Sequence, residues 1–123
     1  MKLTFQLPHP SKSLRPNVRV APYVFRDARR IAKAAASAEA KRVLSELRLN
    51  APGWVKVSYR VVWFHQAAQR PDPDNAIASL KAYIDGIADV GVMLNDRDAY
   101  PSGVEFRKTQ SMPRVEITIE NIQ

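Results

Sequence analysis

Hydrophobic and polar residues alternate in three segments of the chain, at residues 2–7, 55–64 and 115–120. A period of two is typical of a strand that buries one of its faces. The far end of the second segment is almost wholly apolar, so we expect it to be covered on both faces. A fourth strand is predicted around Val104 and Phe106, where the chain is expected to enter a hairpin with the last strand.

Two other segments have the spacing of helices. Residues 23–47 are dense in Ala, Arg, Lys and Glu and place apolar residues at helical intervals, with Ser37 as the point where an interruption is expected, if there is one. Gly91 is well placed to end a second helix over residues 75–90, whose buried stripe consists of Ile77, Leu80, Ile84 and Ile87. The order of elements predicts a single α+β domain over residues 1–123, with two helices packed on one mixed or antiparallel sheet.

The charge balance points to a class of partner. Nineteen Lys and Arg stand against twelve Asp and Glu, and the net charge of +7 favours polyanions such as DNA, RNA or an anionic membrane face. The absence of cysteine excludes disulfides and thiolate metal sites. The apolar run before Pro8 is too short for a signal peptide, and no segment approaches the roughly twenty apolar residues of a membrane span. We therefore expect a cytoplasmic protein that does not bind a membrane.

The strongest chemical signal is the segment Arg70-Pro71-Asp72-Pro73-Asp74-Asn75, directly before the second helix. Its two carboxylates are two residues apart on a stiff, Pro-containing segment that can direct both at one point. Mg²⁺ prefers oxygen ligands and takes one or two carboxylates together with water and substrate phosphate. The segment therefore predicts a divalent-metal site at the start of this helix.

One edge of the second helix extends this polar pattern. On an ideal helical wheel Asp74, Lys81 and Asp85 fall within about 40° of one another. Lys81 could reach a phosphate as a point charge, and Asp85, four residues on, is close enough to pair with Lys81 and fix its position. Asp96 follows the helix and is predicted to return to the same edge as a third carboxylate.

Each of these residues also has an ordinary structural explanation. An Asp before a helix commonly caps it, and Asp beside Asn is common in turns. An exposed Lys–Asp pair contributes little on its own. Only the combination of these groups favours a phosphodiester-cleaving site.

That combination resembles the central motif of the RusA-type Holliday junction resolvases, which are small crossover-junction endodeoxyribonucleases. The resemblance is carried by residues 70–75, by Asp85-Gly86-Ile87, and by Gly91-Val92-Met93-Leu94-Asn95-Asp96. Residues 7–11 and 15–19 are also similar to the N-terminal region of that family. Two positions differ: the lysine lies one turn later than in the family prototype, and Asn95 stands where the family has a first Asp.

The resemblance implies a homodimer that binds four-way DNA junctions and nicks two strands symmetrically with Mg²⁺ or Mn²⁺, without a small-molecule cofactor. The implied catalytic residues are Asp72, Asp74, Lys81 and Asp96, of which the three Asp would hold the metal; Asn75 and Asp85 would support them. Two alternatives stay open. One is a nuclease for flaps or other branched DNA, and the other is a non-catalytic nucleic-acid-binding protein of the same fold, in which the carboxylates only cap the helix.

The remaining residues give weaker predictions. His9 and His65 lack ligand spacing and are not expected to bind metal or act as bases, and Trp54 and Trp63 are expected in the core or a dimer interface. Phosphate contacts are predicted for basic and polar residues of two loops, namely Lys12, Arg15, Asn17, Arg19 and Arg70. The cations of the first helix are predicted to form a solvated face that shares in the positive potential, at Arg26, Arg29, Arg30, Lys33, Lys41 and Arg42.

Overall fold

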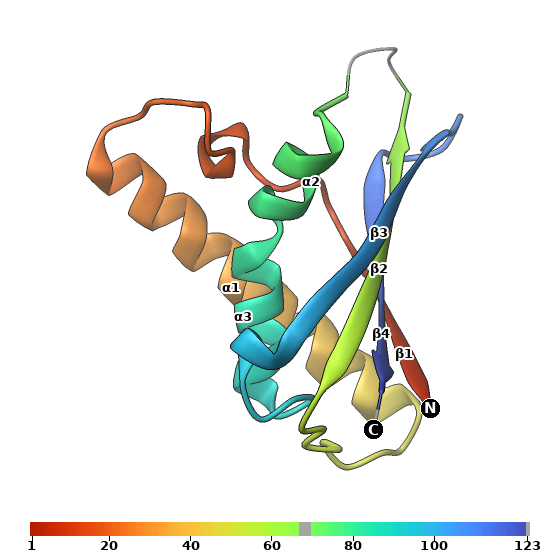
Figure 1. The fold of residues 1–123 in the computed structure, drawn as a ribbon. Helices are drawn as coiled ribbons and strands as arrows, with labels where there is room; N and C mark the ends of the chain where they lie inside the picture. The colour runs from red at the N-terminus through yellow and green to blue at the C-terminus, as the bar shows by residue number, and fades with distance from the viewer. Residues whose placement is uncertain (67–69, 123) are drawn as a thin grey trace.

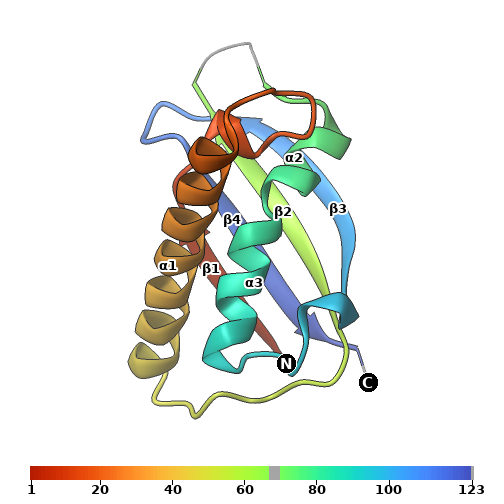
Figure 2. The same ribbon diagram turned by 90° about the vertical axis from the view of Figure 1, so that its left-hand side faces the viewer.

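A four-stranded mixed sheet carries the described helices on one of its two faces (Figures 1 and 2). The computed structural model describes residues 1–66 and 70–122. The strands are β1 (Lys2–Leu7), β2 (Val57–His65), β3 (Ala99–Lys108) and β4 (Arg114–Asn121), in the order β1-β4-β2-β3. The helices are α1 (Pro22–Glu46), α2 (Pro73–Ser79) and α3 (Lys81–Val90), with short 3-10 turns η1 (Lys12–Leu14) and η2 (Asp96–Asp98). The predicted α+β architecture is confirmed.

The alternation in the sequence reappears in the burial of the strands. On β2, every second residue from Val57 to His65 is buried beneath the helices. The inward residues of β1 and β4 are all apolar and buried, at Leu3, Phe5, Leu7, Val115, Ile117 and Ile119. Val62 and Phe64 point to the open face of the sheet and are half-buried there. The apolar end of β2 is therefore covered fully on one face and only in part on the other.

The predicted hairpin between the last two strands is wrong. β3 pairs in parallel with β2, whereas β4 lies between β2 and β1 and runs antiparallel to both. Alternation identifies the residues that face the core, but it carries no information on which strand is the neighbour. β2 and β4 are therefore central, and β1 and β3 form the two edges.

The first helix is continuous, and the interruption considered at Ser37 does not occur. The Ser37 hydroxyl instead donates a hydrogen bond to the carbonyl oxygen of Gly86 in α3 (2.9 Å). The two helices approach closely at this point, since a Cβ on Gly86 would lie 2.3 Å from the Lys33 carbonyl oxygen. No described helix has the length and apolar composition needed to cross a membrane.

The predicted second helix is two helices, because the chain turns at Leu80. The hydroxyl of buried Ser79 donates to the Ala76 carbonyl (2.8 Å), and the Leu80 N–H bonds to the carbonyl of Ile77, only three residues back. Local bonds of this kind compete with the regular helical ladder and bend helices. α3 then ends, as predicted, at Gly91, whose φ of 97° lies in the left-handed region.

Glu39 joins α1 to the edge strand β1. Its Oε2 accepts a hydrogen bond from the backbone N–H of Gln6 (2.8 Å), and Arg42 holds its Oε1 (2.7 Å). Only 10% of the Glu39 side chain is exposed. The carboxylate therefore satisfies a backbone donor on the outer edge of the sheet.

Replacing Glu39 by Ala is expected to lower the free energy of unfolding at pH 7 by about 1–3 kcal/mol, because the Gln6 N–H loses its partner. Burial raises the pKa of Glu39, but the hydrogen bonds from Arg42 and Gln6 outweigh it and bring the pKa below the ordinary 4.5. A carboxyl group whose pKa is lowered by folding stabilises the folded state above pH 4.5. This contribution is lost as the pH falls through the pKa of the folded state. In urea unfolding, the gap between variant and wild type should narrow below pH 4.5; a gap that stays constant would contradict this account.

Candidate active site

Asp72 and Asp74 lie at the start of α2, and both are exposed. Asp72 occupies the N-cap position, yet its side chain makes no capping hydrogen bond. Within residues 1–66 and 70–122, neither carboxylate has a hydrogen-bond or ion-pair partner. Asn75, the predicted supporting residue, follows in the first turn and is half-buried. Capping therefore does not account for Asp72, and both carboxylates are open to a ligand.

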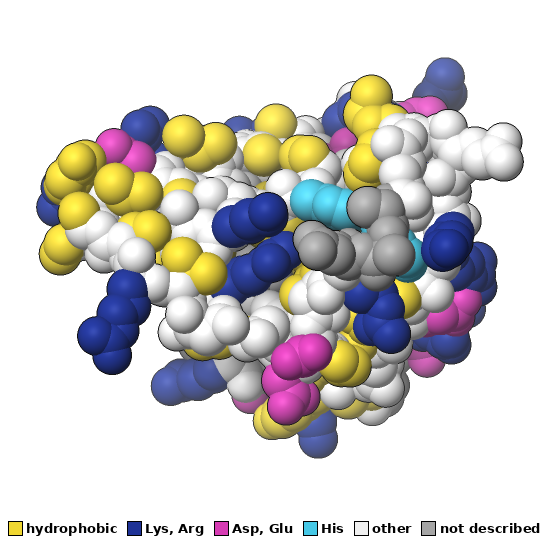
Figure 3. Space-filling model, turned by 90° about the horizontal axis from the view of Figure 1, so that it is seen from above, with side chains coloured by type: hydrophobic (Ala, Val, Ile, Leu, Met, Phe, Trp, Pro, Cys, Tyr) yellow, Lys and Arg dark blue, Asp and Glu magenta, His cyan; other side chains and the backbone are white. Residues whose placement is uncertain are grey.

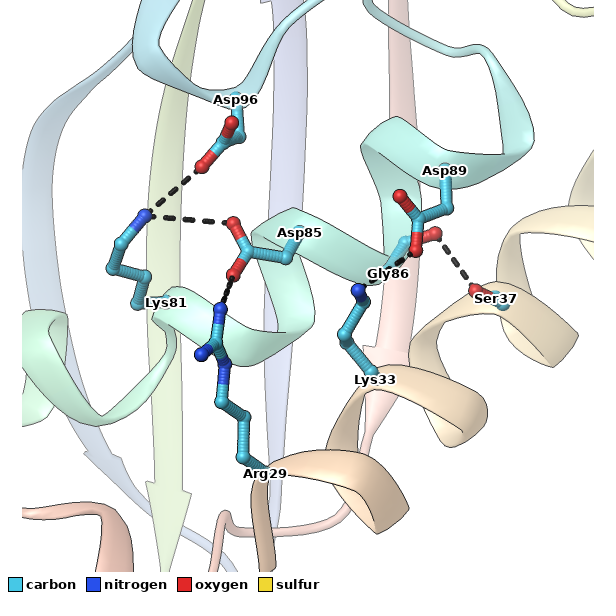
Figure 4. A network of polar contacts seen from close by, with 8 residues as sticks. All are labelled: Arg29, Lys33, Ser37, Lys81, Asp85, Gly86, Asp89 and Asp96. Atoms are coloured by element: carbon cyan, nitrogen blue, oxygen red, sulfur yellow. Dashed lines mark hydrogen bonds and ion pairs between the residues drawn. The ribbon is translucent and has the colours of Figure 1, made fainter. Parts of the chain in front are cut away.

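Lys81, Asp85 and Asp96 form a polar network at the other end of α2 (Figure 4). The Lys81 ammonium, on the first residue of α3, lies 2.9 Å from Oδ2 of Asp96 and 3.4 Å from Oδ1 of Asp85. The predicted pairing of Lys81 with Asp85 is confirmed. Asp85 is only 8% exposed, whereas Lys81 and Asp96 are accessible to solvent.

The network shifts the pKa of all three groups. The hydrogen bond to Asp96 raises the pKa of Lys81, so this side chain stays a cation at neutral pH. Burial, followed by the contact with Asp96, raises the pKa of Asp85. Hydrogen bonding with Asp85 and then with Lys81 lowers the pKa of Asp96 to about 2. Lys81 is thus suited to stabilise negative charge and unsuited to accept a proton.

Arg29 contacts this network, and Tyr59 lies near it. Arg29 is exposed as the helical pattern predicts, with 52% of its side chain accessible, and its Nη2 also lies 3.2 Å from Oδ2 of Asp85. Tyr59 of β2 faces the helices, is 7% exposed, and lies within the electrostatic influence of Lys81. Strand alternation places Tyr59 on the helix side, whereas no local pattern identifies Arg29, because its partner is 56 residues away.

The three predicted metal ligands do not come together in this conformation. Asp74 is in the first turn of α2 and Lys81 follows it by seven residues, which is about 10 Å along a helix. Among the residues that the structure describes, no three Asp, Glu or His side chains lie close enough together to hold a metal ion. The wheel that aligns Asp74 with Lys81 requires a continuous helix, and the turn at Leu80 removes that condition. The acidic residues thus form two groups, one at each end of α2.

No protein-family model and no curated protein matches this chain. Its function is therefore inferred from the groups that the fold brings together. In addition to the acidic residues, the groups that the fold brings together include the cations at one end of the sheet.

The predicted phosphate-binding residues lie at the end of the molecule where α2 begins and β1, β2 and β3 end, the end that Figure 3 views. Arg70 lies over the Phe106 ring and Arg114 over the Phe64 ring, each at 4.0 Å. Five cations at this end pair with no carboxylate in the described part of the chain, namely Lys12, Arg15, Arg19, Arg70 and Arg114. The cations of α1 that do pair are Arg29, Arg30, Lys33 and Arg42. Five cations without a carboxylate partner in the described chain therefore lie at the end that carries Asp72 and Asp74.

Trp63 is buried near this end, and His9 packs against it. His9 stacks on Trp63 with ring centroids 4.6 Å apart, and its Nε2 lies 2.7 Å from the carbonyl oxygen of Phe64. Burial lowers the pKa of His9, which favours the neutral ring. Trp63 and Trp54 belong to the hydrophobic core, one of the two positions that the sequence predicts for them.

Proposed function

We propose that this protein is a Mg²⁺-dependent endodeoxyribonuclease that resolves four-way DNA junctions by paired nicks. The observation that carries the proposal is the pair of exposed carboxylates, Asp72 and Asp74, which have no partner in the described chain. One short helix away, Lys81 is held as a cation by Asp96 and Asp85. Free oxygen donors can bind a divalent metal and a fixed cation can stabilise charge on a phosphate, which are two contributions that metal-dependent phosphodiester hydrolysis uses.

The donor groups fit Mg²⁺, and Mn²⁺ as its substitute. Two exposed carboxylates on one short segment supply oxygen ligands and leave room for water and a substrate phosphate, which is how Mg²⁺ is commonly bound. Asp72 and Asp74 would hold the ion; Asp96, the third predicted ligand, contacts Lys81 and does not complete their site in this conformation. When bound, Mg²⁺ polarises the phosphodiester and offsets the charge on its oxygens.

Lys81 would stabilise the negative charge that develops on the phosphate during hydrolysis. Its ammonium is already oriented by Asp96 and Asp85, so little reorganisation is needed at the moment of reaction. Asp85 is too enclosed to contact a DNA strand, and it would influence the reaction through Lys81. Asn75 is proposed to support the carboxylate pair from the first turn of α2.

The cationic end of the molecule suits the phosphate backbone of DNA. A strand bound by Arg70 and by the Lys12–Arg19 loop would lie at the end where α2 presents Asp72 and Asp74. A four-way junction needs two matched cuts about a two-fold axis, and a C₂ homodimer offers two identical sites in that relation. The resemblance of residues 70–96 to the RusA-type resolvases supports this choice of substrate.

A non-catalytic nucleic-acid-binding protein is the second candidate. The separation of Asp96 from Asp72 and Asp74 favours it, because the three carboxylates form no metal site among the described residues. In that case the cationic end alone would carry the function, and the acidic residues would be dispensable.

A substrate panel distinguishes these candidates. Purified protein would be incubated with labelled four-way junctions, flaps and linear duplexes, each with Mg²⁺ and with EDTA. The proposal expects paired nicks in the junction that require Mg²⁺. Cleavage of flaps in preference to junctions would overturn the junction assignment, and binding of all three substrates without any Mg²⁺-dependent cut would overturn the nuclease assignment.

Arg114, which the sequence did not single out, is expected to contact the DNA backbone. Replacing Arg114 by Ala should lower the slope of log K against log salt by about one and weaken binding at every sequence. The matched control is Lys56→Ala, because Lys56 also lies over an aromatic ring, Tyr100 at 5.4 Å, but at the start of β2. Equal salt slopes for the two variants in fluorescence anisotropy would remove Arg114 from the binding surface.

A further inference from the structure

Asp85 is a buried carboxylate placed between two cations from different helices. Its Oδ2 lies 3.2 Å from Nη2 of Arg29 in α1, and its Oδ1 lies 3.4 Å from Nζ of Lys81 in α3 (Figure 4). Only 9% of the Asp85 side chain is exposed, so water contributes little to its solvation. Each oxygen therefore depends on its own cation.

The position of the Lys81 ammonium depends on how the two Asp85 oxygens are shared between Arg29 and Lys81. Arg29 contacts Oδ2 and Lys81 contacts Oδ1, and from this position the Lys81 ammonium also reaches Asp96 at 2.9 Å. Without Arg29, Lys81 would be the single cation near a buried carboxylate. The Lys81 ammonium would then be drawn toward Asp85 and away from the accessible position beside Asp96.

Arg29 also shares a cavity with Lys81. The two are the charged residues in the wall of a pocket of about 240 Å³, whose other walls are Leu14, Phe25, Ala78, Ser79 and Ala82. About half of the Arg29 side chain is exposed, at 52%, so the residue does not serve as core packing. The Arg29 side chain extends from α1 to Asp85 of α3, so its role at this position is electrostatic.

We propose that Arg29 is a positioning residue, which holds Asp85 so that Lys81 is presented to the substrate phosphate. This inference rests on the proposed nuclease function for the role of Lys81. Arg29 itself contacts no reacting atom; it acts through Asp85.

The same helix pair contains a matched control. One turn along α1, Lys33 forms an ion pair with Asp89 of α3 at 3.2 Å. This pair also bridges α1 and α3, and it includes none of the residues that surround Lys81 (Figure 4). Lys33→Ala therefore removes a bridge of the same kind and leaves the Lys81 network intact.

Single-turnover cleavage of a four-way junction tests the inference. Arg29→Ala is expected to lower the maximal rate about 10- to 100-fold with little change in DNA affinity, because the lysine is misplaced while the substrate is still bound. Arg29→Lys should recover most of the rate, since it keeps a cation beside Asp85, and Lys33→Ala should match wild type. Lys33→Ala should unfold within about 4 °C of wild type, because it loses one partly exposed ion pair. Arg29→Ala should lose more stability, because it leaves Oδ2 of the buried Asp85 without its cation, so the rates are compared well below both unfolding temperatures.

A second measurement does not depend on cleavage. In a ¹⁵N NMR spectrum of the lysine side chains, an ammonium held in ion pairs exchanges slowly with water and gives a visible signal. The Lys81 signal should keep its wild-type chemical shift in Lys33→Ala and should move in Arg29→Ala, because the ammonium there leaves Asp96 for Asp85. An unchanged Lys81 signal, or equal cleavage rates for Arg29→Ala and Lys33→Ala, would overturn the inference. If the wild-type protein cleaves no DNA, the proposed function fails while the NMR comparison still tests the positioning by Arg29.

Discussion

Replacing Gly86 by Ala is expected to lower the free energy of unfolding by about 3 kcal/mol, although Ala is the better helix former. The added Cβ would lie 2.3 Å from the carbonyl oxygen of Lys33 and 2.9 Å from the Cβ of Ala36. The nearest of these atoms belongs to the backbone of α1, so α1 and α3 must move apart. The Ser37 hydroxyl, 2.9 Å from the Gly86 carbonyl, would lose its partner as well.

Denaturant unfolding decides the sign of this effect. Helix propensity alone predicts that Gly86→Ala stabilises the protein by about 1 kcal/mol, because Gly is the poorer residue within a helix. Close packing predicts a loss instead. A stability equal to or above that of wild type would show that α1 and α3 are not in close contact at Gly86. It would also count against the ion pair between Arg29 of α1 and Asp85 of α3.

The second large effect concerns cleavage. Replacing Lys81 by Met should lower the rate of junction cleavage about 100- to 1,000-fold at saturating DNA, the cost typical of removing one preorganised group that stabilises transition-state charge. The Met side chain keeps most of the apolar length of Lys and loses only the ammonium. Junction affinity measured in EDTA should stay near that of wild type.

Lys41→Met is the control for this substitution. Lys41 is exposed on α1 and has no ion-pair partner in the described chain, so the variant loses the same charge far from Asp96. Its cleavage rate is expected to equal that of wild type. If Lys81→Met and Lys41→Met cleave at the same rate, Lys81 has no role in catalysis.

The sequence predicts local structure well where a pattern depends on the chain's own neighbours. The alternation of apolar residues identifies the inward faces of β1, β2 and β4, and the pairing of Lys81 with Asp85 follows from a spacing of one helical turn. Gly91 marks the end of α3 because its backbone adopts the left-handed conformation. Each of these features is determined by residues close together in the sequence.

The errors concern relations between distant or competing groups. The partner of β3 depends on the whole sheet, so the alternation at Val104 and Phe106 could not exclude a hairpin. The turn at Leu80 depends on how the buried Ser79 hydroxyl competes with the helical ladder, although the apolar stripe passes through it without a break. The sequence does not distinguish Arg29 from the other cations of α1, because its carboxylate partner is in α3.

The function of the acidic pair at the start of α2 is the central claim, and one measurement tests it most directly. Cleavage of a labelled four-way junction would be followed with Mg²⁺ and with EDTA for wild type, Asp72→Asn and Asp74→Asn. Asn keeps the size of Asp and removes its charge, and neither side chain has a structural partner in the described residues, so both variants should fold and bind the junction. We expect Mg²⁺-dependent cleavage by wild type and a loss of at least about 100-fold in each variant. EDTA-sensitive cleavage that persists at the wild-type rate in both variants would contradict the claim.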